Sequence, residues 1–91
     1  MTVEVHLTSV LQSLVGAKSV TSEGATVGEL LANLNGAYPG FRDQITGEDG
    51  QLHRFVNIYL NDEDIRYLDA LDTALQDGDV VSILPALAGG D

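Results

Sequence analysis

The N-terminal segment alternates between apolar and polar residues, with Val3, Val5 and Leu7 separated by polar side chains. A period of two predicts a strand with one buried face. A second apolar patch lies at residues 10–15, and residues 18–21 then indicate a short strand that returns antiparallel to the first. The connection is longer than a two-residue turn, so the pattern leaves the register of this hairpin open.

The clearest helix begins at Thr26. The hydroxyl of Thr26 can accept a hydrogen bond from the amide of Glu29, whose side chain reaches back in turn, which is the arrangement of a capping box. Apolar residues follow at helical spacing and mark one buried face: Val27, Leu30, Leu31, Leu34 and Tyr38. Pro39 and Gly40 end this helix, and we expect one further turn at residues 41–45.

The second half of the chain predicts shorter elements. Residues 55–60 alternate again and indicate a strand whose face toward the helix carries Val56, Ile58 and Leu60. The expected elements around it are a polar loop at 46–50, a turn at 61–62, a short strand around Ile65, a helical segment over Leu68, Leu71 and Leu75, a turn at 76–79 and a final strand at 80–84.

This order of elements predicts an α+β domain, in which one main helix packs on a mixed sheet of four to five strands. A chain of 91 residues supports a single domain. We assign residues 1–84 to this domain and residues 85–91 to a C-terminal tail.

The composition narrows the classes of partner. The formal net charge is −10, from 14 acidic and 4 basic residues, which opposes binding to nucleic acid or to anionic lipid. The charge favours a partner with a basic docking surface, although acidity can also serve only to keep a small protein soluble. There is no cysteine, and the N-terminus shows no signal peptide, so we expect a cytoplasmic protein. We also expect a monomer when the protein is free of its partners.

The tail carries the candidate chemistry. Gly89 and Gly90 lack a Cβ atom, so their backbone can pass through a narrow tunnel, with Leu87 and Ala88 preceding them. A main-chain carboxylate at such an end can be presented to an enzyme that activates it. Asp91 stands beyond the glycine pair and would have to be removed before Gly90 could offer its own carboxylate.

Residues 77–90 are similar to the closing signature of the prokaryotic sulfur carriers of the MoaD/ThiS family, which have the ubiquitin-like β-grasp fold. Residues 52–66 resemble the CysO-like actinobacterial branch of that family, whose members serve cysteine biosynthesis. The resemblance places the family's terminal glycine on Gly90 and its penultimate glycine on Gly89. It departs from the family at Asp91, because these carriers normally end at the second glycine.

The resemblance implies a protein cosubstrate rather than an enzyme. An E1-like adenylyltransferase and sulfurtransferase, which binds ATP and Mg²⁺ itself, would adenylate Gly90, and sulfur would then replace the adenylate to give a thiocarboxylate. This group would donate sulfur to a biosynthetic enzyme that makes cysteine or another sulfur-containing metabolite. Relatives with extra C-terminal residues are trimmed by a zinc-dependent JAMM-type peptidase, which implies the same processing at Asp91.

A docking patch for these partners is expected on the sheet face away from the helix, where Phe55, Tyr59, Val80 and Leu84 should lie. The alternative is that the loop at 41–51 covers this face and makes it a minor core. Docking is favoured, because a thin sheet with one helix has one free face.

Other candidate sites are weaker. The acidic run at 61–64 lacks the glycine and the distal glutamate of a calcium loop, so we interpret it as a solvated turn. His6 and His53 are isolated and do not predict a metal site, and no phosphate-binding loop is present. Two alternative functions remain open: a ubiquitin-like modifier joined to lysines through Gly90, and an interaction subunit whose tail is incidental.

Overall fold

A computed structural model describes residues 2–46 and 56–85 of the chain. Within these residues, a mixed five-stranded sheet has the strand order β2-β1-β5-β3-β4. The strands are β1 (Thr2–Leu7), β2 (Ser19–Glu23), β3 (Val56–Leu60), β4 (Glu63–Asp64) and β5 (Val80–Pro85). β5 lies parallel to β1 and antiparallel to β3, while β1–β2 and β3–β4 are antiparallel pairs. The predicted α+β class and mixed sheet are confirmed.

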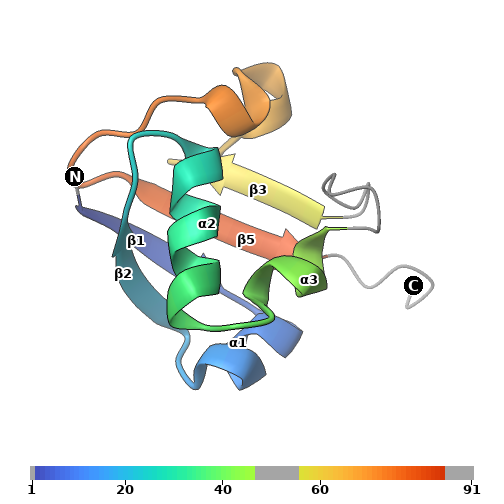
Figure 1. Cartoon of the computed structure of the whole chain (residues 1–91). Coiled ribbons are helices and arrows are strands. Elements are labelled where there is room, and N and C mark those ends of the chain that lie inside the picture. Colours follow the sequence, from blue (N-terminus) through green and yellow to red (C-terminus); the bar gives the residue numbers. More distant parts are fainter. Residues whose placement is uncertain (1, 47–55, 86–91) are drawn as a thin grey trace.

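The main helix, α2 (Val27–Ala37), lies across one face of this sheet (Figure 1). The capping box is present, since the Thr26 hydroxyl accepts from the Glu29 amide at 3.2 Å. The Glu29 carboxylate reaches back one residue further than the simple motif, to the amide of Ala25 at 3.0 Å. The helix ends at Ala37, with Tyr38 as its C-cap directly before Pro39, as the sequence predicts.

The predicted antiparallel pairing of the first two strands is confirmed, but the sequence analysis assigned no helix to the connection between them. The structure forms a short helix, α1 (Ser9–Val15), which ends at Gly16 in the left-handed conformation with φ 85°. Helical geometry places Leu11 in the core with no exposed surface. The expected return strand therefore starts later and runs from Ser19 to Glu23.

The turn at residues 41–45 is confirmed as α3 (Phe41–Ile45). Phe41 and Ile45 have no exposed surface and belong to the same core as the buried face of α2. Because α3 contacts α1 and α2, it lies on the helical side of the sheet. The alternative in which this segment covers the opposite face is therefore wrong for residues 41–45, and residues 47–51 lie outside the described part of the chain.

The helical segment expected over Leu68–Leu75 is also corrected. Only a 3₁₀ turn forms there, η2 (Ala70–Asp72), and Ala70 has a positive φ of 52° that no continuous helix accepts. The strand expected around Ile65 is wrong at that residue, because β4 ends at Asp64 and Ile65 begins another 3₁₀ turn, η1 (Ile65–Tyr67). Leu75 follows in a non-helical stretch, where its amide donates to the Ala25 carbonyl at 2.9 Å. The hydrogen bonds that join this segment to the start of α2 stabilise a non-helical path more than the spacing of its leucines stabilises a helix.

The turns that bracket β5 and β3 agree with the prediction. Asn61 and Asp62 have φ values of 50° and 73°, which are typical of a two-residue hairpin turn, and they join β3 to the short strand β4. The turn at 76–79 is closed by a bond from the Asp79 amide to the Gln76 carbonyl at 3.0 Å, and Gly78 supplies the positive φ of 89°. In the described residues, no helix is long and apolar enough to cross a membrane.

Candidate docking face and tail exit

β5 is the central strand of the sheet and the strand from which the tail departs. Its core-facing residues, Val81 and Ile83, have no exposed surface. Val81 is paired with Val5 on β1 and with Leu60 on β3, so the strand is held on both sides. The tail therefore begins at the end of a strand that is held in place by the core and by both neighbouring strands.

The last two residues of β5 extend beyond β1. The final pair with β1 is Leu7 and Ile83, whereas pairing with β3 continues through Leu84 and Pro85. Proline has no amide N–H, so Pro85 cannot donate to a neighbouring strand, and it marks a natural end of the ladder. The tail residues Leu87, Ala88, Gly89, Gly90 and Asp91 lie outside the described residues, and the structure gives only the point from which they start.

We call the sheet surface that faces away from α2 the outer face. On β5 it carries Val80, Ser82 and Leu84, because Val81 and Ile83 point into the core. Tyr59 lies opposite Ser82 on this face and is half-buried, while Leu84 is 37% exposed. The structure thus brings Tyr59, Val80 and Leu84 to one surface. Phe55 lies outside the described residues, and the docking role of all four stays a prediction.

Among the described residues, polar groups separate these apolar side chains, so this part of the outer face is not a continuous apolar patch. Asn57 lies opposite Leu84, and His6 lies opposite Ser82 from the other side. The imidazole Nε2 of His6 contacts the Glu4 carboxylate at 2.5 Å, which ties together two neighbouring outer-face residues of β1. A partner that covers this face must therefore supply polar as well as apolar groups.

An ion pair stands at the β3–β4 side of the outer face, and the sequence analysis did not identify it. The Arg66 Nη2 donates to the Asp64 carboxylate at 2.9 Å, and the same Nη2 donates to the side-chain oxygen of Asn57. The hydrogen bonds from the Arg66 side chain and amide hold the pKa of Asp64 below its ordinary value of 3.8. The pKa of Arg66 is raised by the same side-chain bond. Asp64 caps η1 by accepting from the amide of Arg66, so an aspartate two residues before an arginine is the signal that could have revealed the pair.

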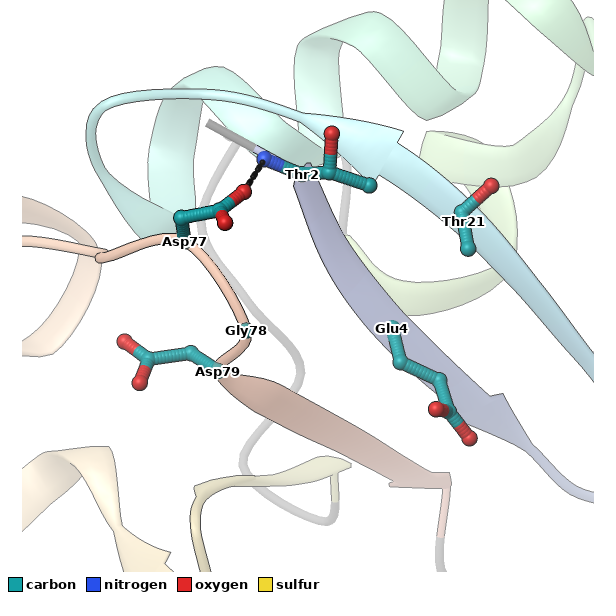
Figure 2. A pocket seen from close by; sticks show the side chains of 6 residues that line it. All are labelled: Thr2, Glu4, Thr21, Asp77, Gly78 and Asp79. Carbon is teal, nitrogen blue, oxygen red and sulfur yellow. Dashed lines mark hydrogen bonds between the residues drawn. The ribbon is translucent and has the colours of Figure 1, made fainter.

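The other end of β5 forms an acidic depression of about 280 Å³, lined by Thr2, Glu4, Thr21, Asp77, Gly78 and Asp79 (Figure 2). Its carboxylates already have protein partners. Asp77 accepts from the Thr2 amide at 2.9 Å, and Asp79 accepts from the Gln76 amide at 2.8 Å. Figure 2 shows the side chains of Glu4 and Asp79 pointing in different directions rather than to a common centre. In the part of the chain that the structure describes, no cluster of acidic or histidine side chains could hold a metal ion.

The chain matches the model of the ThiS family over residues 5–90. Sulfur carrier protein CysO of Mycobacterium tuberculosis is 45% identical over 93 residues, which span 99% of this chain and 100% of the relative. Its crystal structure has a TM-score of 0.87 at 43% identity and covers 93% of this chain and 99% of that chain.

A chain of the Amycolatopsis orientalis BexX/CysO complex also gives a TM-score of 0.87, at 40% identity, covering 97% of this chain and 99% of that chain. Small archaeal modifier protein 3 of Haloferax volcanii is 37% identical over 93 residues, spanning 99% of this chain and 100% of the relative. The structural matches confirm the ubiquitin-like β-grasp fold, and the sequence matches confirm the resemblance to sulfur carriers of the CysO type.

Proposed function

The chain belongs to the ThiS family, and from this premise we propose that it is a sulfur carrier that works through the main-chain carboxylate of Gly90. The observation that carries the proposal is the full-length similarity to CysO sulfur carriers, which extends through the glycine pair to residue 90. The fold is consistent with this role, because β5 ends at Pro85 and five residues then lead to Gly90. Five extended residues span at most about 17 Å, so the carboxylate can enter a partner while the folded domain stays outside.

The proposed reaction has two steps, both performed by an E1-like partner. A carboxylate is a poor electrophile, so the Gly90 carboxylate first attacks the α-phosphate of ATP, which forms an acyl adenylate and releases pyrophosphate. Hydrosulfide then attacks the carbonyl, loses its proton and displaces AMP, which leaves a thiocarboxylate on Gly90. The partner supplies ATP, Mg²⁺ and phosphate stabilisation, and this chain supplies the acyl group.

The thiocarboxylate would then act as a tethered nucleophile in a sulfur-accepting biosynthetic enzyme. Tethering raises the effective concentration of sulfur at the acceptor. The BexX/CysO complex is a precedent for a CysO protein bound to another protein, and on that basis we propose that this chain also forms a complex with the enzyme that accepts its sulfur. The similarity to CysO favours cysteine as the product.

Asp91 makes the full-length chain a precursor in this proposal. While Asp91 is present, the Gly90 carbonyl is part of an amide, and the terminal carboxylates belong to aspartate. We propose that a JAMM-type zinc peptidase hydrolyses the Gly90–Asp91 bond and releases free aspartate.

The test compares full-length protein with a form that ends at Gly90. Each is incubated with the activating enzyme, ATP and sulfide, and the intact mass is measured. Only the shorter form should gain the mass that corresponds to replacement of one oxygen by sulfur. Equal thiocarboxylate formation by the two forms would refute the requirement for trimming, and failure of both would refute the carrier function.

Conjugation to proteins is a second candidate function, favoured by the similarity to small archaeal modifier protein 3. A modifier would join Gly90 to an amine of its target as a stable amide, whereas a carrier releases its sulfur and returns to a carboxylate. Expression of a tagged form ending at Gly90 in the native host separates the two. Tagged adducts of higher mass that survive thiol treatment would support the modifier, and a free thiocarboxylate without such adducts would support the carrier.

A further inference from the structure

The guanidinium of Arg66 is fixed to the outer face by groups on two strands. Its Nε lies 3.2 Å and 3.3 Å from the two carboxylate oxygens of Asp64, and its Nη2 bonds both Asp64 and Asn57. The backbone amide of Arg66 also donates to Asp64 at 2.9 Å, so the stem of the side chain starts from a fixed position. These bonds remove much of the rotamer freedom that an exposed arginine otherwise loses only when it binds a partner.

The outward side of this ion pair is cationic. The side chain of Asp64 is 12% exposed, whereas that of Arg66 is 55% exposed. Among the described residues, no hydrogen bond engages Nη1 of Arg66, so its N–H groups remain available as donors. Although the two charges cancel at a distance, a partner that touches this surface meets a guanidinium with the carboxylate behind it.

The position of Arg66 relates it to the tail. Asn57, which accepts from its Nη2, is the residue paired with Leu84, and Leu84 is followed only by Pro85 in β5. The guanidinium of Arg66 therefore lies at the level of Leu84, with β3 between it and the end of β5 from which the tail leaves. The opposite end of β5 carries the acidic group of Glu4, Asp77 and Asp79, four or five residues away along the strand, or about 13–17 Å.

A partner attracted by the net charge of −10 is expected to present basic groups, and these would be repelled locally by a fixed guanidinium. A carboxylate on the partner removes this conflict, because it can accept a charge-assisted hydrogen bond from Nη1 of Arg66. We infer that Arg66 is a specificity-determining contact at the tail exit, which pairs with a carboxylate on the surface of the E1-like activating enzyme, next to the apolar contact made by Leu84. This inference rests on the proposed function.

The test measures adenylation by ATP–pyrophosphate exchange, with the activating enzyme and the form that ends at Gly90. Arg66→Gln is compared with Arg42→Gln, which changes the net charge equally but lies on α3, away from the outer face. We expect Arg66→Gln to raise the KM for the carrier by about tenfold or more, as loss of a central interface arginine does, with kcat little changed. Arg42→Gln should stay within about twofold of wild type. Arg66→Lys should fall between the two, because lysine keeps the charge but loses the planar group that Asp64 and Asn57 hold in place.

A further variant separates contact from structural support. Asp64→Asn removes the ion pair within the domain but keeps the cation, so it should raise KM less than Arg66→Gln does. If Asp64→Asn raises KM as much as Arg66→Gln, or if Arg66→Gln matches Arg42→Gln, the inference is overturned while the carrier function stands. If the wild-type form supports no exchange, the proposed function itself fails, and the inference fails with it.

Discussion

Neighbouring residues of β5 offer a direct separation of folding from docking, because Ile83 faces the core and Leu84 faces outward. Ile83 has no exposed surface, so Ile83→Ala loses both transfer free energy and packing, and we expect it to lower the free energy of unfolding by about 2–5 kcal/mol. Leu84 is already 37% exposed. Its truncation removes three carbons, worth about 2.4 kcal/mol if fully buried and about 1.5 kcal/mol at this exposure. No closed cavity forms on an open face, so this second value is an upper bound.

In the activation assay the order reverses: Leu84→Ala should change the KM for the carrier more than Ile83→Ala does. A domain of 91 residues has a total stability of about 5–14 kcal/mol, so Ile83→Ala stays mostly folded over most of this range. It should then keep the wild-type KM per folded molecule. Leu84→Ala should raise the KM for the activating enzyme by about fivefold or more, which corresponds to a loss above about 1 kcal/mol.

Urea unfolding followed by circular dichroism measures the first quantity, and ATP–pyrophosphate exchange measures the second. If Ile83→Ala is too unstable at the assay temperature, Ile83→Val, with an expected cost of about 0.5–1.5 kcal/mol, replaces it. The reasoning is refuted if Leu84→Ala destabilises the domain as much as Ile83→Ala while its KM stays at the wild-type value. That result would make the outer face a second core rather than a docking surface.

Two further predictions concern stability alone. A Cβ added at Gly24 would lie 2.6 Å from the backbone nitrogen of Leu30, so Gly24→Ala should lower the free energy of unfolding by urea by about 1–3 kcal/mol. Gly36 lies exposed in the last turn of α2 with nothing within 4 Å of an added Cβ, so Gly36→Ala should raise this free energy by up to about 0.5–1 kcal/mol. Equal shifts would show that the contact at Gly24 relaxes without cost. Because the pKa of Asp64 is lowered in the folded state, its contribution to stability is present above its ordinary value of 3.8 and is lost as the pH falls through the lower folded value. The stability difference between wild type and Arg66→Gln should therefore shrink between about pH 6 and about pH 2, and a difference independent of pH would contradict the assigned cause.

The parts of the fold that were predictable from the sequence are those in which local and tertiary preferences agree. The cap at Thr26 and the spacing from Val27 to Leu34 describe the same helix that the core requires. The alternation at Val3, Val5 and Leu7 likewise matches a strand with one buried face. In these segments the burial pattern follows directly from the period of the apolar residues.

The errors occur where tertiary contacts override a short local signal. α1 has only seven residues, below the length at which a helix is stable alone, and it exists because Leu11 is buried. The stretch after Ile65 has leucines at helical spacing, but the bonds to residues 25–27 near the start of α2 require a non-helical path. No local pattern carries that information.

Some residues of the candidate site could likewise be placed from local sequence patterns, and others could not. Strand alternation was enough to place Tyr59, Val80 and Leu84 on one surface. The bond between Arg66 and Asn57 joins residues nine positions apart, and it depends on the register of β3 and β4, which hydrophobic patterning does not determine. The chemistry assigned to Gly90 came from family resemblance and remains to be tested by experiment.

The parallel pairing of the first and last strands has a mechanical consequence. Four residue pairs, from Glu4 and Val80 to Leu7 and Ile83, join β1 to β5. A force that pulls the tail while the N-terminus is held acts along these strands and loads the pairs together in shear, instead of opening them one after another. The domain should therefore resist mechanical unfolding when a peptidase or an unfoldase pulls on its C-terminal end. An enzyme that binds the tail can then shorten it while the domain stays folded.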